Sequence, residues 1–346
     1  MVRIVNNKLV VLVDYRGSFY STVSSARTLC TMNVSSIVGY FTSAGFDVQV
    51  LKFTDVDFSK NWQGVPVLYT SSEDIGLLYK GFIEDVVLGL DAAGALLLPN
   101  YRYLRSHHNK LMMELLRYQL FPEEAKRLQT SFFGTFEELK SAENSRKWPK
   151  VLKAAYGAGS KQVVMAKGRE ELLSLAKKIS RSWSFGDVLR ELRSRLIWRG
   201  YAPRSLNRTK FIVQNLVENL DGDFKVLRFG KRFYVLSRKN RKNDFRASGS
   251  GNFSREIPSS VNLTELLNYS KWASDIIGSP VCSLDVAFDG NDFHLIEFQC
   301  LNFGTLTAEF SDYCHVFSEG TWSKALGKCD LELVFCDSVM LYLSER

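Results

Sequence analysis

The segment that most constrains this chain spans residues 283–299, SLDVAFDGNDFHLIEFQ, where acidic and amide side chains interrupt two apolar runs. A polar turn at residues 289–292 separates the runs, which predicts a β-hairpin. Burial of a lone carboxylate is strongly unfavourable, so Asp285 and Glu297 require partners in such strands. Oxygen ligands that converge from two adjacent strands suit Mg²⁺. The hairpin is therefore a candidate metal site.

The register of the hairpin decides whether these oxygens meet. Glu297 and Gln299 are two residues apart, so they share one face of their strand. Asp285 joins that face if the turn has an odd register centred on Asn291, whereas a strict two-residue turn directs Asp285 away. On this segment alone, a magnesium site and an ordinary edge hairpin with solvated carboxylates both stay open.

Composition narrows the class of protein. The 346 residues are 45% hydrophobic, which suits a globular protein of two or three lobes. A net charge of +8 attracts anions such as nucleotides, phosphorylated metabolites, acidic peptides or nucleic acid. The longest apolar run, residues 86–98, is interrupted by Asp91, and no signal peptide is visible. We therefore expect a cytoplasmic protein without membrane insertion.

The first hundred residues alternate between short apolar runs and longer amphipathic ones, which predicts a small parallel α/β domain. Ligands of open α/β sheets gather at the ends of the strands, so Arg16 and Glu73 are substrate-site candidates. The expected elements are strands at residues 9–13, 47–53, 65–70 and 95–98, and helices at 26–44 and 75–90.

The pattern changes near residue 104, where a helix is expected over residues 106–120 with Ser106 as its N-cap. From Phe211 onward the chain is rich in β-forming residues. The segment 185–208 is arginine-rich and partly helical in pattern, and is interpreted as an insertion. The expected domains are residues 1–104, 105–210 with the insertion 185–208, and 211–346.

A lysine and a small-residue loop form a candidate phosphate site. Lys153 ends an expected strand and is followed by Gly157, Gly159 and Ser160. Glycine lets backbone N–H groups approach phosphate oxygens, and lysine supplies charge. The lysine precedes the glycines, so this is not a P-loop. A plain β-hairpin with an exposed lysine is the alternative.

The order of these parts resembles the ATP-grasp superfamily, and most closely the RimK-like carboxylate–amine ligases. An α/β domain comes first, followed by Lys110 at a helix start, the Lys153 loop, the strand 211–217, and the acidic hairpin. The resemblance covers residues 100–310 in motif order. It implies an α/β (α+β) ATP-grasp fold with an N-terminal Rossmann-like pre-ATP-grasp domain.

The resemblance also implies ATP and Mg²⁺ as cofactors and assigns roles to individual residues. Those implied to bind the nucleotide are Lys110, Lys153, Gly157, Gly159, Ser160, Gln214, Asn215 and Val217. Those implied to bind the metal are Asp285, Glu297 and Gln299. Those implied to face the transferred phosphate and the acceptor carboxylate are Arg246, Arg238 and Lys225.

The chain departs from the family pattern at two of these positions. The final metal motif of the family is Glu-x-Asn, whereas this chain has Glu297-Phe-Gln299, so Asn302 is an alternative ligand. On the strand implied to meet adenine, the family carries an acidic residue after a glutamine. Here Gln214 is followed by Asn215.

The leading hypothesis is an ATP-dependent carboxylate–amine ligase that forms an amide bond through an acyl phosphate. Its partners would be small-molecule or peptide carboxylates and amines. An ATP-grasp phosphotransferase on an anionic acceptor, like the inositol phosphate kinases, and a non-catalytic nucleotide-binding module, like the synapsins, are the alternatives. Nucleic acid is not expected, because few aromatic residues are interleaved with the basic clusters.

Overall fold

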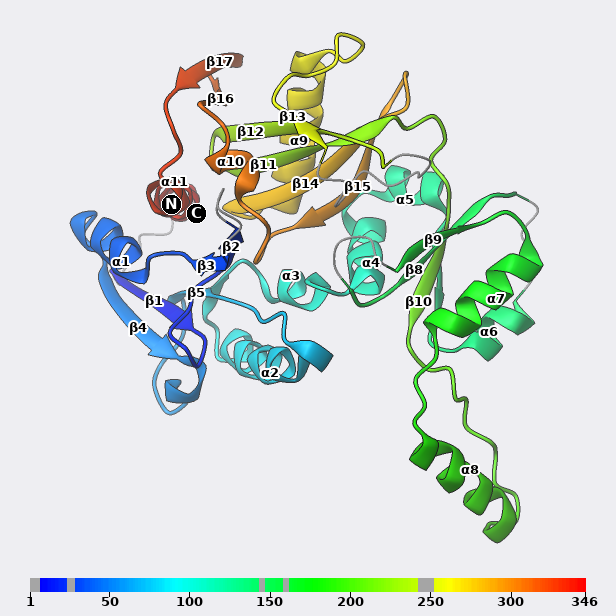
Figure 1. The fold of residues 1–346 in the computed structure, drawn as a ribbon. Coiled ribbons are helices and arrows are strands. Elements are labelled where there is room, and N and C mark those ends of the chain that lie inside the picture. The colour runs from blue at the N-terminus through cyan, green and yellow to red at the C-terminus, as the bar shows by residue number, and fades with distance from the viewer. Residues whose placement is uncertain (1–6, 24–28, 143–146, 158–161, 242–251) are drawn as a thin grey trace. The chain divides into compact units, whose positions relative to one another are not determined.

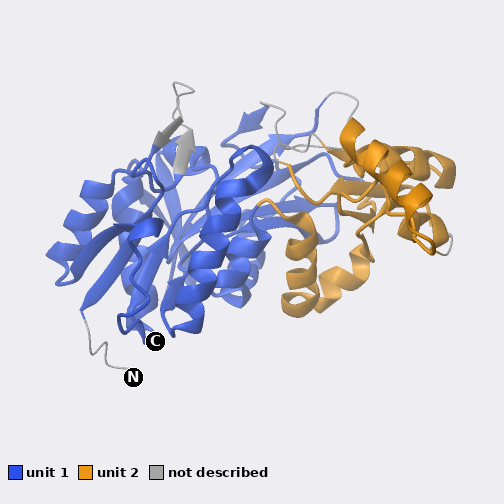
Figure 2. Cartoon of the chain, turned by 90° about the horizontal axis from the view of Figure 1, so that it is seen from below, with its two compact units in different colours: residues 1–107, 219–346 blue, residues 108–218 orange. Residues whose placement is uncertain are grey.

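We analysed a computed structural model of the 346-residue chain, which divides into two compact units (Figures 1 and 2). Unit 1 comprises residues 1–107 and 219–346, and unit 2 comprises residues 108–218. The structure describes residues 7–23, 29–142, 147–157, 162–241 and 252–346.

The N-terminal part of unit 1 is built on a four-stranded parallel sheet. Its strands, in spatial order, are β4 (Asp47–Lys52), β1 (Lys8–Val13), β5 (Pro66–Tyr69) and β6 (Leu96–Leu98). The two central strands are continuous apolar runs, as expected of parallel strands that are buried on both faces. The predicted parallel sheet of this region is confirmed.

The helices of this part begin later than the sequence pattern predicts. Helix α1 (Val34–Ser43) starts after Asn33, whose side chain accepts a hydrogen bond from Ser36 N. The residues before it include an antiparallel ribbon of β2 (Ser21–Val23) and β3 (Leu29–Thr31), so the predicted helix 26–44 is too long. The remaining elements are the 3-10 turns η1 (Phe53–Asp55) and η2 (Ile75–Leu77) and the helices α2 (Leu78–Ala92) and α3 (Tyr101–Ser106).

The C-terminal part of unit 1 is a seven-stranded antiparallel sheet. Its strands are β15 (Phe293–Gln299), β14 (Val281–Phe288), β11 (Gly222–Phe229), β12 (Arg232–Lys239), β16 (Tyr313–Ser318) and β17 (Thr321–Leu326), with β13 (Phe253–Ser254) paired to β12. Helix α9 (Leu263–Ile277) covers one face, where Arg228 contacts Ser274 and Asp275. Because side chains alternate along β11, Lys225 and Asp223 point to the opposite face. The short helix α10 (Leu306–Glu309) follows β15.

One hydrophobic core joins the two sheets of unit 1. The last helix, α11 (Leu331–Ser344), packs against α1 as well as against β11 and β14. Its Phe335 belongs to the same buried cluster as Leu12 of the parallel sheet and Leu227 of the antiparallel sheet. The N-terminal and C-terminal parts, predicted as separate domains, therefore form a single unit.

Unit 2 is built on a four-stranded sheet. Its strands, in order, are β7 (Ser131–Phe133), β10 (Phe211–Asn215), β8 (Lys150–Ala154) and β9 (Val163–Ala166). Since β10 lies inside this sheet, unit 2 extends to Glu218, eight residues beyond the predicted boundary at residue 210. The helices are α4 (Lys110–Leu120), α5 (Pro122–Leu128), α6 (Phe136–Ser141), α7 (Arg169–Ile179) and α8 (Phe185–Ile197).

The start of α4 differs from the sequence prediction. Its N-cap is Asn109, whose side chain accepts from Met112 N, and Ser106 instead ends α3. Lys110 is therefore the first residue of the helix. Across the described ranges, no helix combines the length and apolarity needed to cross a bilayer.

Candidate functional site

The predicted β-hairpin, formed by β14 and β15, is present, and it places Asp285 directly opposite Glu297. Phe288 pairs with Phe293 across a four-residue turn, so an unbroken ladder would place Asp285 opposite Ile296. Instead, Ile296 is the extra residue of a β-bulge, and the register shifts by one. The predicted facing of Asp285 and Glu297 is confirmed, but the bulge produces it and not an odd turn.

Gln299 and Ser283 extend the same face of the hairpin. These two residues are cross-strand partners, and Gln299 donates a hydrogen bond from Nε2 to Glu297 Oε1 over 2.8 Å. The Ser283 hydroxyl is buried and has no hydrogen-bond partner among the residues that the structure describes. This face therefore carries carboxylate, amide and hydroxyl oxygens together, and it is not the face that α9 covers.

Two cations hold the Asp285 carboxylate. Lys225 Nζ lies 2.9 Å from Oδ1, and Arg238 NH2 lies 2.9 Å from Oδ2. Burial on its own would raise the pKa of Asp285, but the charges of Arg238 and Lys225 outweigh it and lower that pKa to about 2. Asp285 therefore stays ionised at neutral pH.

Asp223 completes a four-membered charge cluster with Arg238, Asp285 and Lys225. The Arg238 guanidinium donates two hydrogen bonds to Asp223, over 2.6 and 2.8 Å. Burial, and then repulsion from the Asp285 carboxylate, raise the pKa of Asp223 to about 6 despite Arg238. The two carboxylates thus share one arginine but differ in acidity.

Asn302, the alternative metal ligand, has another structural role. Its Oδ1 accepts hydrogen bonds from Thr70 Oγ1 (3.2 Å) and Ser71 N (3.1 Å), and its Nδ2 donates to Ser71 O. The side chain is buried, and its backbone adopts a positive φ of 47°. Asn302 therefore fastens the loop after β15 to the end of β5, which favours Gln299 as the amide ligand.

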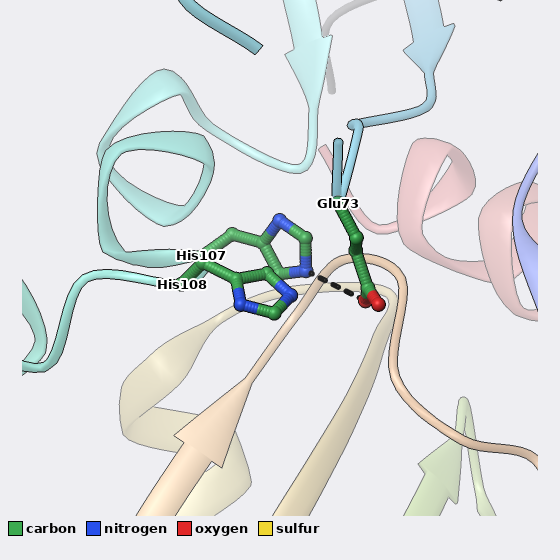
Figure 3. Close-up of side chains that lie close together, drawn as sticks. All are labelled: Glu73, His107 and His108. Atoms are coloured by element: carbon green, nitrogen blue, oxygen red, sulfur yellow. Dashed lines mark ion pairs between the residues drawn. The ribbon is translucent and has the colours of Figure 1, made fainter. Parts of the chain in front are cut away.

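The substrate-site candidates lie at the ends of the parallel strands, as predicted. Glu73 Oε1 lies 3.6 Å from Nε2 of the buried His107 (Figure 3). The Nδ1 atom of His107 is 2.9 Å from Ser71 Oγ. Arg16 instead folds back on Asp14, with Nε and NH2 donating to its carboxylate. Glu73 is thus oriented by a buried histidine that carries no recognisable signal in the sequence. His108, also drawn, is the first residue of unit 2.

Within unit 2, the structure brings Lys110 and the predicted phosphate loop together. Lys110 N donates to Ala155 O over 2.8 Å, and its Nζ donates to Gly157 O over 2.6 Å. Gly157 has a φ of 117°, which favours glycine. Lys153 lies on β8, which leads into this loop. Gly159 and Ser160 lie outside the described residues.

On β10, the polar side chains that were predicted to bind the nucleotide form hydrogen bonds inside unit 2 instead. Gln214 is buried and donates to Thr130 Oγ1 over 2.8 Å. Asn215 accepts a 2.7 Å hydrogen bond from Lys150 Nζ. The backbone of residues 214–217 is left to contact a ligand, together with the half-buried side chains of Leu216 and Val217.

Sequence reasoning assigned no role to Asp223, although a signal for its pairing with Arg238 was present. Gly230 and Lys231 form a two-residue turn between β11 and β12, because Phe229 pairs with Arg232. Counting back from that turn places Asp223 opposite Arg238, as observed. The predicted residue Arg246 lies outside the described residues.

The comparisons with known proteins define the fold. No protein-family model matches the sequence, and no curated protein sequence matches it. The structure of a RimK-domain ATP-grasp protein from Sphaerobacter thermophilus matches with a TM-score of 0.51 and 10% identity, covering 96% of this chain and 99% of that one. D-cycloserine synthetase DcsG matches with a TM-score of 0.51 and 13% identity, covering 96% and 98%. The predicted ATP-grasp fold is confirmed.

Proposed function

We propose that this protein is an ATP-dependent carboxylate–amine ligase. The observation that carries the proposal is the hairpin face on which Asp285, Glu297 and Gln299 are aligned by a bulge. A bulge that corrects the register at acidic residues is typical of a strand shaped for a site. The similarity of the fold to a RimK-domain protein and to a synthetase supports the same class of chemistry.

The residues of this face fit Mg²⁺. Glu297 and Gln299 are half-buried oxygen donors in contact with each other, and Asp285 is ionised. A carboxylate offers about four lone-pair positions, so Asp285 retains capacity beyond its two cationic partners. The buried, unpartnered hydroxyl of Ser283 on the same face also suits a polar occupant. Bound there, Mg²⁺ would neutralise the phosphate charge that develops during transfer.

We assign the nucleotide to the residues of unit 2 that the sequence singled out. Lys110 and Lys153 would contact the phosphates of ATP, and the loop from Gly157 through Gly159 and Ser160 would supply backbone N–H donors. Residues 214–217 would meet the adenine through their backbone, because Gln214 and Asn215 use their side chains internally.

The proposed reaction needs positioning and charge neutralisation and no protein nucleophile. An oxygen of the substrate carboxylate attacks the γ-phosphorus of ATP, which forms an acyl phosphate and releases ADP. The substrate amine then attacks the acyl carbon, an amide forms, and inorganic phosphate leaves with the proton lost to solvent. Lys225 and Arg238 would hold Asp285 in place, and Arg246 would face the transferred phosphate.

The test is a screen of amino acids and short peptides, in pairs, for conversion of ATP to ADP with Mg²⁺. We expect turnover only when both an acid and an amine are present, with a hydroxamate formed when hydroxylamine replaces the amine. Glu297→Ala should lower turnover by at least about a hundredfold. The exposed Glu345→Ala variant, altered at the end of α11, is the matched control and should retain full turnover.

Three results would contradict the proposal. Amide formation without ATP cleavage would exclude the acyl phosphate route. A phosphorylated product formed from one anionic acceptor, with no need for an amine, would instead establish a phosphotransferase. Full turnover in Glu297→Ala would remove the metal assignment.

A further inference from the structure

Helix α8 carries an apolar stripe that the described chain leaves exposed. Phe185, Leu189, Leu192 and Leu196 are 74%, 52%, 51% and 87% exposed. Their spacing of four, three and four residues places them on one side of the helix. The helix stands apart from the sheet of unit 2, at the end of two extended segments (Figure 1). Four neighbouring apolar side chains in water mark an interaction surface.

Residues 181–208, which comprise α8 and the two extended segments beside it, form an arm that is held together by internal hydrogen bonds. At its base, Ser182 Oγ accepts from Arg208 N over 2.9 Å and pairs one extended segment with the other. At its tip, Glu191 accepts from the Tyr201 hydroxyl (2.7 Å) and from Arg204 N (3.1 Å). Glu191 precedes Leu192 by one residue and so lies about 100° around the helix from it. The returning segment therefore packs beside the stripe and does not cover it.

The width of the stripe indicates a helical partner. Apolar residues alternately four and three apart occupy the a and d positions of a heptad, the seam by which one helix packs on another. Arg193 follows Leu192 and Arg195 precedes Leu196, so charged residues border the seam on both sides. A helix that lies in a bilayer interface typically presents a broader apolar face than such a seam.

The flanking charges select the kind of helix. With the leucines at a and d, Arg193 and Arg195 fall at the e and g positions, which face the partner. A second copy of α8 would bring Arg193 against Arg195, whose charge is only partly offset by its 3.2 Å ion pair with Glu191, and like charges at these positions oppose pairing. Residues 181–208 as a whole contain seven arginines and two acidic residues. Acidic e and g positions on the partner would complement this charge.

We propose that the exposed stripe of α8 is a docking site for an acidic amphipathic helix of another protein. This binding would be separate from the proposed ligase activity, because it uses none of the residues assigned to ATP or metal. Binding of the helix is measured in the absence of ATP, so a negative result would leave the ligase proposal unaffected.

The experiment uses the full chain and a fluorescent peptide of about three heptads, with leucine at a and d and glutamate at e and g. We expect anisotropy to show saturable binding that weakens with salt. A second peptide with lysine at e and g should bind at least about tenfold more weakly, because its charges repel Arg193 and Arg195.

Substitutions of exposed residues on α8 distinguish the contribution of the stripe to binding from that of the rest of the helix. Leu189→Ser with Leu192→Ser should weaken binding of the acidic peptide by about a hundredfold, since two apolar contacts are lost. Ile197→Ser alters an equally exposed apolar residue outside the stripe, 55% exposed, and should leave binding unchanged. Arg193→Glu should weaken the acidic peptide and strengthen the lysine peptide.

Four results would overturn the proposal. The first is absence of binding to the acidic peptide, and the second is equal binding of both peptides. The third is a dimer in sedimentation velocity that Leu189→Ser with Leu192→Ser dissociates, which would identify a second copy as the occupant. The fourth is binding to phosphatidylserine-containing vesicles, lost in the same variant, without peptide binding.

Discussion

At the scale of single residues, one guanidinium contacts two carboxylates whose pKa values are shifted in opposite directions. Arg238 bonds Asp223 twice and also contacts Asp285, while Lys225 contacts Asp285 as well. Asp285 forms ion pairs with two cations, whereas Asp223 is hydrogen-bonded to Arg238 and repelled by Asp285, so their pKa values move apart. The cluster keeps Asp285 charged on the proposed metal face.

Asp223 should make stability depend on pH between about 4 and 6. Its folded-state pKa of about 6 exceeds its ordinary value of 3.8, so the folded chain binds its proton more tightly than the unfolded chain does. Its stabilising contribution is therefore present below about pH 4 and lost as pH rises to 6, at most about 3 kcal/mol. Asp223→Asn should abolish that loss.

The measurement is the midpoint of urea unfolding at a series of pH values. The urea midpoint of the wild type minus that of Asp223→Asn should fall as pH rises from 4 to 6 and then level off. Asp221→Asn, which alters a nearby exposed carboxylate, should give a pH profile parallel to that of the wild type. Parallel profiles for wild type and Asp223→Asn would show that Asp223 titrates normally.

At the scale of elements, the β14–β15 hairpin shows how one residue decides whether a site exists. Side chains alternate along a strand, so a slip of one position transfers a whole set of side chains to the other face. Phe288 and Phe293 fix the turn end of the hairpin, and the bulge at Ile296 then brings Glu297 opposite Asp285. The turn and the bulge together set the register.

Deletion of Ile296 should therefore preserve the site. Without the bulge residue, Glu297 follows Leu295 directly, and a regular ladder still pairs it with Asp285. We expect ATP turnover to stay within about tenfold of wild type, because the facing oxygens are retained. Deletion of Phe298 instead moves Gln299 to the opposite face relative to Glu297 and should abolish turnover. Similar losses in two folded deletion variants, judged by circular dichroism, would contradict this account.

The hairpin also shows what sequence reasoning could and could not reach. The position of the two strands and the common face of Glu297 and Gln299 followed from alternation alone. The bulge did not, because Ile296 is an ordinary strand residue within an apolar run. In the same way, the strand that carries Gln214 was visible in the sequence pattern, but the hydrogen bond from Gln214 to Thr130 depends on tertiary packing.

At the scale of the whole molecule, the chain leaves unit 1 after His107 and re-enters it at Asn219. The ordered motifs predicted the ATP-grasp fold from sequence, but not the way in which unit 1 is assembled. Its single core combines β1 and α1 with β11, β14 and α11 from the far end of the chain. Sequence reasoning assigned 211–346 to its own domain because the chain becomes rich in β-forming residues at Phe211. The contacts of α11, which links the two sheets, depend on tertiary packing.

This organisation predicts which fragments fold. Unit 2 has its own hydrophobic cluster, including Leu152, Leu172 and Phe211, so residues 108–218 should fold alone with a cooperative thermal transition. Residues 1–107 should not, because their core is completed by α11 and β11. Circular dichroism melting and dispersion of amide signals in NMR would measure both. A cooperative, well-dispersed 1–107 fragment would contradict the shared core.

Binding of MgATP by the whole chain should raise its melting temperature. A ligand at a hundredfold excess over its Kd stabilises the folded state by about 2.7 kcal/mol. Lys153→Ala should remove about 1.4 kcal/mol of that gain, which corresponds to a tenfold rise in Kd, because a phosphate contact is lost. Lys177→Ala, on the exposed side of α7, is the matched control and should keep the full gain. Chelation of the metal with EDTA should reduce the gain in wild type, since the proposed ligand is the magnesium complex of ATP. An equal gain in Lys153→Ala and wild type would exclude Lys153 from the nucleotide site, and an equal gain with EDTA would show that the nucleotide binds without the metal.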